Sequence, residues 1–172
     1  MTSAADPLTL VLVGPMAAGK TSVGRRVARR LGVAFIDTDK RIVAAHGPIP
    51  DIFEEHGEAH FRALECAAVA EALSEGGVIS LGGGAVTEAA TRDLLAEHPV
   101  VFLTVSPDAV ADRLRGSNRP LLAGEDPLER WKKIFEERRG WYAEVSSATF
   151  DTSRRPMQKI ADEIVAWRRE QR

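Results

Sequence analysis

"LTLVLVGPMAAGKTSVGRRVARRLG", residues 8–32, joins an apolar run to a glycine-containing loop and then to a helical pattern. The run 8–13 is apolar without strict alternation, which is typical of a strand buried on both faces. In 20–32 apolar residues recur on one helix face, and Gly32 at the end of this stretch can end the helix. The loop between them matches G-x-x-x-x-G-K-[ST], and this strand–loop–helix context predicts a phosphate-binding loop.

This loop predicts a nucleotide site. Its backbone N–H groups converge on phosphate oxygens, and the helix that follows points its positive end at them. Lys20 can reach the β- and γ-phosphates, and the Thr21 hydroxyl can bind Mg²⁺. Ala17 stands where glycine is common, and a positive φ there would cost about 1–2 kcal/mol. The predicted nucleotide contacts in the loop are Gly14, Ala17, Ala18, Gly19, Lys20, Thr21 and Ser22.

The rest of the chain alternates short apolar runs with helical patterns, which predicts an α/β fold with a parallel sheet and helices on both faces. We expect a single domain over 1–172 in which 38–65 and 112–126 break the rhythm as mobile inserts. The expected strands are 8–13, 33–37, 77–81, 100–105 and 148–151. The expected helices are 20–32, a short one ending near Gly47, two pieces broken near Gly57, 87–98, 106–116, 127–145 and one from Pro156 onward.

Composition excludes several classes of protein. The 172 residues carry 23 basic and 25 acidic side chains, so no bulk charge indicates a nucleic-acid or membrane partner. The single cysteine, Cys66, excludes an internal disulfide framework and fits a reducing compartment. Neither a signal peptide nor a membrane-spanning run is recognisable. We therefore expect a soluble, cytoplasmic monomer.

Two aspartates in "DTD" close the second expected strand. Residues i and i+2 of an extended segment point to the same side, so Asp37 and Asp39 should both face the mouth of the phosphate loop. One can hold Mg²⁺, and the other can orient an attacking hydroxyl or accept its proton. The alternative interpretation makes Asp39 the N-cap of a helix over 40–46.

Glycines and arginines complete the candidate site. "LGGGAV" follows the third expected strand at the edge where open α/β sheets bind ligands, and glycines let a ligand approach backbone N–H groups. Arg62 and Arg138 are candidate anion ligands, with solvated surface charge as the alternative. Arg119 lies in a loop hinged by Pro120 and Gly124 and could close over a transferring phosphate. The three glycines are Gly82, Gly83 and Gly84.

Taken together, these residues resemble shikimate kinases, a family of P-loop kinases with a three-layer α/β fold. The matching pieces are "GPMAAGKTSVGRRVARRLG", "DTDKRI", "IFEEHGEAHFRALE", "SLGGGAV", "NRPLLAG", "ERRGWY" and "DTSRRP", which span nearly the whole chain. The resemblance implies transfer of the γ-phosphate of ATP, with Mg²⁺, to the 3-hydroxyl of shikimate, a step toward chorismate and the aromatic amino acids. It also implies that 38–65 binds the acceptor and that 112–126 is a lid.

For the acceptor, the resemblance implies that Asp39 contacts the reacting hydroxyl and that Asp37 serves the Mg²⁺ shell. It implies that Arg62 and Arg138 clamp the shikimate carboxylate and that the three glycines, Gly83 above all, hold shikimate from the backbone side. A small anionic polyol needs arginines for its carboxylate and an aspartate for its hydroxyl, so the physical interpretation agrees.

For the nucleotide, the resemblance implies that Arg119 is a lid arginine on the phosphates. Arg155, or its neighbour Arg154, would border the adenine with Pro156. Arg113 would face the adenine if a gap separates it from Arg119. The sequence departs from the family pattern at Ala17, where glycine is usual, and in a lid that looks short.

Other functions stay open at this point. A gluconate kinase or a nucleoside monophosphate kinase shares the phosphate loop, although two aspartates after the second strand favour a hydroxyl acceptor. A GTPase-like switch needs N-K-x-D, which the sequence lacks. An inactive interaction module is disfavoured because Lys20, Thr21, Asp37, Asp39 and Arg119 are all present.

Overall fold

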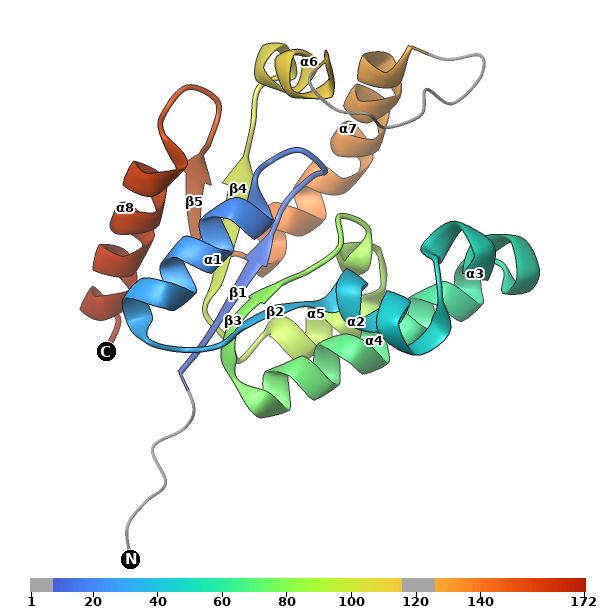
Figure 1. Cartoon of the computed structure of the whole chain (residues 1–172), viewed down its shortest axis with the longest axis horizontal. Helices are drawn as coiled ribbons and strands as arrows, with labels where there is room; N and C mark the ends of the chain where they lie inside the picture. Colours follow the sequence, from blue (N-terminus) through green and yellow to red (C-terminus); the bar gives the residue numbers. More distant parts are fainter. Residues whose placement is uncertain (1–7, 116–125) are drawn as a thin grey trace, which may run out of the picture.

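The computed structural model describes residues 8–115 and 126–172. Five parallel strands form its sheet in the order β2-β3-β1-β4-β5, which confirms the predicted parallel sheet (Figure 1). β1 and β3 lie side by side at the centre, so the loops that follow both open at one edge. The strands are β1 Thr9–Val13, β2 Phe35–Asp37, β3 Gly77–Ser80, β4 Val100–Thr104 and β5 Ala148–Asp151.

Helices cover both faces of the sheet, as the sequence predicts (Figure 1). β1 is buried along its whole length, and its side chains alternate between two cores. Leu10 and Leu12 pack with α1, α6 and α8, whereas Val11 and Val13 pack with α4 and α5. The helices are α1 Lys20–Leu31, α2 Thr38–His46, α3 Ile49–His56, α4 Glu58–Glu75, α5 Ala89–Leu95, α6 Pro107–Arg115, α7 Pro127–Val145 and α8 Met157–Glu170, with a 3-10 turn η1 Ala85–Thr87.

The segment 38–65, expected as an insert, forms α2, α3 and the start of α4. These helices have a small core of their own around Ile42, Ile52 and Phe61. Figure 1 shows α3 projecting away from the sheet. The assignment of this segment to acceptor binding stays a prediction.

Two expected elements differ from the structure. β2 begins at Phe35 rather than residue 33, because Gly32 ends α1 at a φ of 69° and the Val33 N–H still bonds to Ala28. The helix expected over 87–98 is shorter, because Thr87 belongs to η1, Glu88 is extended and only Ala89–Leu95 is α-helical. Among the described residues, no helix has the length and apolar character that crossing a membrane requires.

Candidate active site

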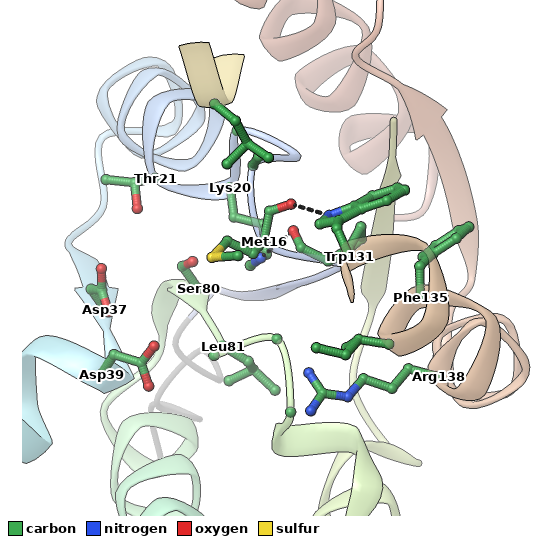
Figure 2. Close-up of a pocket in the computed structure, with 18 of the residues that line it drawn as sticks. Met16, Lys20, Thr21, Asp37, Asp39, Ser80, Leu81, Trp131, Phe135 and Arg138 are labelled. Carbon is green, nitrogen blue, oxygen red and sulfur yellow. Dashed lines mark hydrogen bonds between the residues drawn. The ribbon is translucent and has the colours of Figure 1, made fainter. Parts of the chain in front are cut away.

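One cavity of about 970 Å³ opens at the carboxyl edge of the sheet (Figure 2). Its walls come from the phosphate loop, the β2–α2 junction, the turn after β3, and α7. Sequence-distant candidates therefore meet in one place. The predicted site residues that line it are Ala17, Gly19, Lys20, Thr21, Ser22, Asp37, Asp39, Gly82, Gly83, Gly84 and Arg138.

The phosphate loop has the backbone that its sequence predicts. A Cβ on Gly14, whose φ is 151°, would lie 2.4 Å from the Leu103 carbonyl oxygen, so β4 leaves no room for a side chain there. Lys20 donates from Nζ to the carbonyls of Gly14 and Pro15, at 2.8 and 2.9 Å. The lysine thus folds back over its own loop, where a bound phosphate would lie.

Ala17 adopts a φ of 69°, so the positive φ considered from the sequence is present. Its carbonyl accepts a hydrogen bond of 2.6 Å from the Arg113 guanidinium. The next carbonyl, of Ala18, accepts one of 2.7 Å from the Thr152 hydroxyl. Arg113 also donates to the Thr152 carbonyl at 2.5 Å, so α6 and the end of β5 brace the strained loop together.

The two aspartates lie in the cavity for a reason other than strand alternation. The helix already starts at Thr38, and the Asp37 carboxylate caps it by accepting the Lys40 N–H at 3.2 Å. The interpretation of Asp39 as the N-cap was therefore wrong. Asp39 lies in the first turn of α2 and also lines the cavity, because the first helical turn rotates it back toward the loop.

The Asp39 carboxylate is partly buried beside other charges. Within the described residues its Oδ1 atom is buried and has no hydrogen-bond partner. Burial raises the pKa of Asp39, and repulsion by Asp37 raises it further, whereas Lys20 and Arg62 oppose the rise. A buried oxygen lacking a partner is suited to accept a substrate hydroxyl.

Two of the glycines after β3 lie against charged side chains of the protein. A Cβ on Gly82 would lie 2.6 Å from Asp39 Oδ1 and 3.0 Å from Glu65 Oε2. A Cβ on Gly84 would lie 2.4 Å from the Arg62 guanidinium. Gly82 and Gly84 therefore also make room for charged side chains of the protein. All three glycines line the cavity, and their contact with a ligand stays a prediction.

Gly83 differs from its neighbours. A Cβ there would meet nothing closer than the Met16 nitrogen at 3.6 Å, with Arg138 Nη1 at 3.7 Å. Its carbonyl accepts a hydrogen bond of 2.5 Å from the Tyr142 hydroxyl. Burial raises the pKa of Tyr142 to about 12, while the Arg138 guanidinium opposes the rise by its charge and by a hydrogen bond to the phenol.

Arg62 lies behind the glycine turn and is nearly buried. It forms ion pairs with Glu65, at 2.8 Å, and with Glu58, at 3.4 Å. Glu65 is 1% exposed, and its burial raises its pKa to about 7 despite the hydrogen bond from Arg62. The role of Glu65 was not predicted from the sequence, although its i, i+3 spacing from Arg62 on a helix indicates the pair.

The remaining candidates lie elsewhere. Arg155 pairs with Glu163, and Pro156 is the N-cap residue of α8; neither lines the cavity. Arg119, and with it 116–125 of the expected lid, lies outside the described residues. Beyond Arg138, α7 contributes a part of the cavity wall that was not predicted from the sequence, namely Pro127, Arg130, Trp131, Ile134 and Phe135.

Comparison with known proteins gives a consistent result. A family model described as shikimate kinase matches residues 16–169. The shikimate kinase of Corynebacterium efficiens is 45% identical over 158 residues, which is 91% of this chain and 94% of that protein.

Solved structures agree with the sequence comparison. The shikimate kinase of Acinetobacter baumannii, in complex with shikimate, superposes with a TM-score of 0.87 at 36% identity, covering 96% of this chain and 95% of that one. A gluconokinase from Sinorhizobium meliloti 1021 covers 96% of this chain and 94% of its own, with a TM-score of 0.66 at 25% identity. The chain is therefore more similar to that shikimate kinase than to this gluconokinase, in both sequence and shape.

Proposed function

This chain belongs to the shikimate kinase family, and on that premise we propose that it transfers the γ-phosphate of ATP to the 3-hydroxyl of shikimate. The products are shikimate 3-phosphate and ADP, on the route to chorismate. One observation supports this most strongly: Lys20, Asp39 and Arg138 line a single cavity, so a phosphate donor, a hydroxyl acceptor and its carboxylate have places in one site (Figure 2).

On the nucleotide side, the phosphate loop holds the β- and γ-phosphates. Backbone N–H groups of 16–22, which include the N-terminus of α1, supply donors, and Lys20 supplies a positive charge for the transferring group. We assign Arg119, Arg155 and Pro156 to the nucleotide on the family resemblance. Arg113 contributes through the loop carbonyl that it holds, and its contact with adenine stays a prediction.

Thr21 and Asp37 are the proposed Mg²⁺ ligands. No cluster of three or more His, Cys, Asp and Glu side chains occurs in the described part of the chain. Mg²⁺ needs few protein ligands in kinases, where phosphates and waters complete its shell, and the hydroxyl and carboxylate oxygens at this cavity wall fit it. When bound, the ion would neutralise charge on the phosphates.

On the acceptor side, Asp39 orients the 3-hydroxyl and takes its proton as the oxygen attacks the γ-phosphorus. The raised pKa of Asp39 makes it a stronger base than an exposed aspartate. Because the N-cap role belongs to Asp37, the Asp39 carboxylate is available for this task.

The carboxylate of shikimate is proposed to lie between Arg138 and the glycine turn. Arg138 lines the cavity, and a guanidinium grips a carboxylate with two parallel bonds. Arg62 approaches from behind Gly84 and is ion-paired with Glu65 and Glu58, so we assign it the smaller share of carboxylate binding. Gly83 offers its backbone at the cavity surface.

A coupled assay of ADP release tests the choice of acceptor. We expect turnover with shikimate, and little with gluconate or nucleoside monophosphates at equal concentration. Preferential turnover of gluconate would replace the proposal with the gluconate kinase alternative. We further expect a monomer that works in the cytoplasm, which size-exclusion chromatography and fractionation of cells can check.

A further inference from the structure

One face of α7 contacts both loops of the cavity. Near its start, the Trp131 indole N–H donates to the Met16 carbonyl of the phosphate loop at 2.8 Å, drawn as a dashed line in Figure 2. Eleven residues later, the Tyr142 hydroxyl donates to the Gly83 carbonyl of the glycine turn at 2.5 Å. An interval of eleven residues is about three helical turns, so both side chains lie on one face.

Aromatic packing makes this face rigid. The Trp131 and Phe135 rings stack with centroids 5.1 Å apart and 13° between their planes. Phe135 packs against Tyr142 at 6.4 Å, and Phe102 of β4 stacks on Tyr142 at 5.2 Å. Trp131 and Tyr142 are both buried, so neither donor swings freely into solvent.

The two loops meet where these bonds hold them. A Cβ on Gly83 would lie 3.6 Å from the Met16 nitrogen and 3.7 Å from the Gly14 oxygen. Gly83 thus lies beside the backbone of the phosphate loop at Met16 and Gly14, and the carbonyls of Met16 and Gly83 each accept a hydrogen bond from α7.

We propose that Trp131 and Tyr142 are positioning residues, through which α7 sets the phosphate loop and the glycine turn at the separation that phosphate transfer requires. Trp131 acts on the nucleotide through Met16, and Tyr142 acts on the acceptor through Gly83 and Arg138. This inference rests on the proposed function. The rate of in-line transfer falls when the reacting atoms are displaced slightly, so a fixed separation of the two loops favours the reaction.

Two conservative variants test the two ends separately. Trp131→Phe keeps a ring for Phe135 but loses the N–H donor, and Tyr142→Phe keeps the ring but loses the hydroxyl. Trp131→Phe should raise the KM for ATP and the Kd for ADP by about 3- to 10-fold, with the KM for shikimate within about twofold of wild type. Tyr142→Phe should raise the KM for shikimate by a similar factor and leave the KM for ATP and the Kd for ADP within about twofold of wild type. Both variants should lower kcat.

Trp167→Phe is the matched control, because Trp167 of α8 does not line the cavity. It should leave both KM values unchanged, and the melting temperatures of all three variants show whether each folds. The inference would be overturned if both variants changed the same KM, or if neither variant changed a KM. It would also be overturned if the loss of activity followed the melting temperature alone. If wild type does not use shikimate, the proposed function fails by itself, and calorimetric ADP affinities still decide the phosphate-loop half.

Discussion

Arg113 donates a 2.6 Å hydrogen bond to the carbonyl of Ala17, whose φ is 69°. The donor comes from α6, 96 residues further along the chain, and holds a backbone conformation that alanine disfavours. The strain in the phosphate loop is thus offset by a tertiary contact that reaches the same residue.

Replacing Ala17 by glycine should therefore stabilise the fold. Relief of the left-handed φ gains about 1–2 kcal/mol, and the greater freedom of unfolded glycine costs about 0.4–1 kcal/mol. We expect a net gain of roughly 0.5–1 kcal/mol in the free energy of unfolding, measured by urea titration. Ala18→Gly is the control, because Ala18 is fully buried and has no positive φ. Loss of its buried methyl group and the greater freedom of unfolded glycine should lower the free energy of unfolding by about 1 kcal/mol or more. Equal destabilisation by both variants would contradict strain at Ala17.

Asp39→Asn should separate binding from transfer. The amide fills the same space but cannot take a proton, so kcat should fall by about 10²- to 10⁴-fold while ADP affinity changes little. Initial rates and calorimetric titration of ADP measure the two quantities. Wild-type turnover in this variant would remove Asp39 from the reaction.

Asp37→Asn is the companion to that variant. Asparagine is as good an N-cap as aspartate, so α2 should persist, whereas the charge at the proposed Mg²⁺ ligand is lost. We expect a higher Mg²⁺ concentration at half-maximal rate. Since the Asp37 charge raises the Asp39 pKa, the acid limb of kcat/KM should also move to lower pH. An unchanged Mg²⁺ requirement and pH profile would contradict both roles.

Arg138→Lys should weaken the acceptor specifically. Lysine keeps the charge but loses the two-pronged grip, so kcat/KM for shikimate should fall by about 10- to 150-fold with the KM for ATP little changed. The control substrate is shikimate with its carboxylate reduced to an alcohol. With this analogue, kcat/KM should be low for wild type and little lower for the variant. The same loss with acid and alcohol would mean that Arg138 does not read the carboxylate.

Glu65 should make stability depend on pH. Burial raises its pKa from 4.5 to about 7, so between these values the folded chain binds more protons than the unfolded chain. The contribution of Glu65 to folding is therefore greatest below pH 4.5 and is lost as pH rises to about 7. Relative to Glu65→Gln, wild type should lose on the order of 1–3 kcal/mol across that window. Parallel unfolding free energies for the two proteins from pH 4.5 to 7.5 would contradict a raised pKa.

The sequence was sufficient for the sheet, the phosphate loop and most cavity residues, because each depends on local pattern. β1 and α1 lie where apolar periodicity and Gly32 predict them. The positive φ at Ala17 also follows from its place in the loop pattern. Local patterns of this kind are set by neighbouring residues and need no knowledge of the packed fold.

The contacts that arrange these residues could not be predicted from the sequence, because they join segments that are far apart along the chain. Nothing local indicates that Gly84 accommodates Arg62 or that Trp131 bonds to Met16, 115 residues earlier. Asp39 reached the cavity by a helical turn rather than by strand alternation, so a correct placement rested on a wrong premise. The i, i+4 spacing of Trp131 and Phe135 predicts that they share one helix face, but it does not predict which loop that face contacts.

The proposed reaction esterifies the 3-hydroxyl of shikimate with the γ-phosphate of ATP in this cavity. A ³¹P–¹H correlation spectrum of the product formed from purified enzyme, ATP, Mg²⁺ and shikimate measures it directly. We expect one new phosphomonoester, coupled to the proton on carbon 3 and equimolar with ADP. An ester on another carbon, or ADP accompanied only by inorganic phosphate, would contradict it.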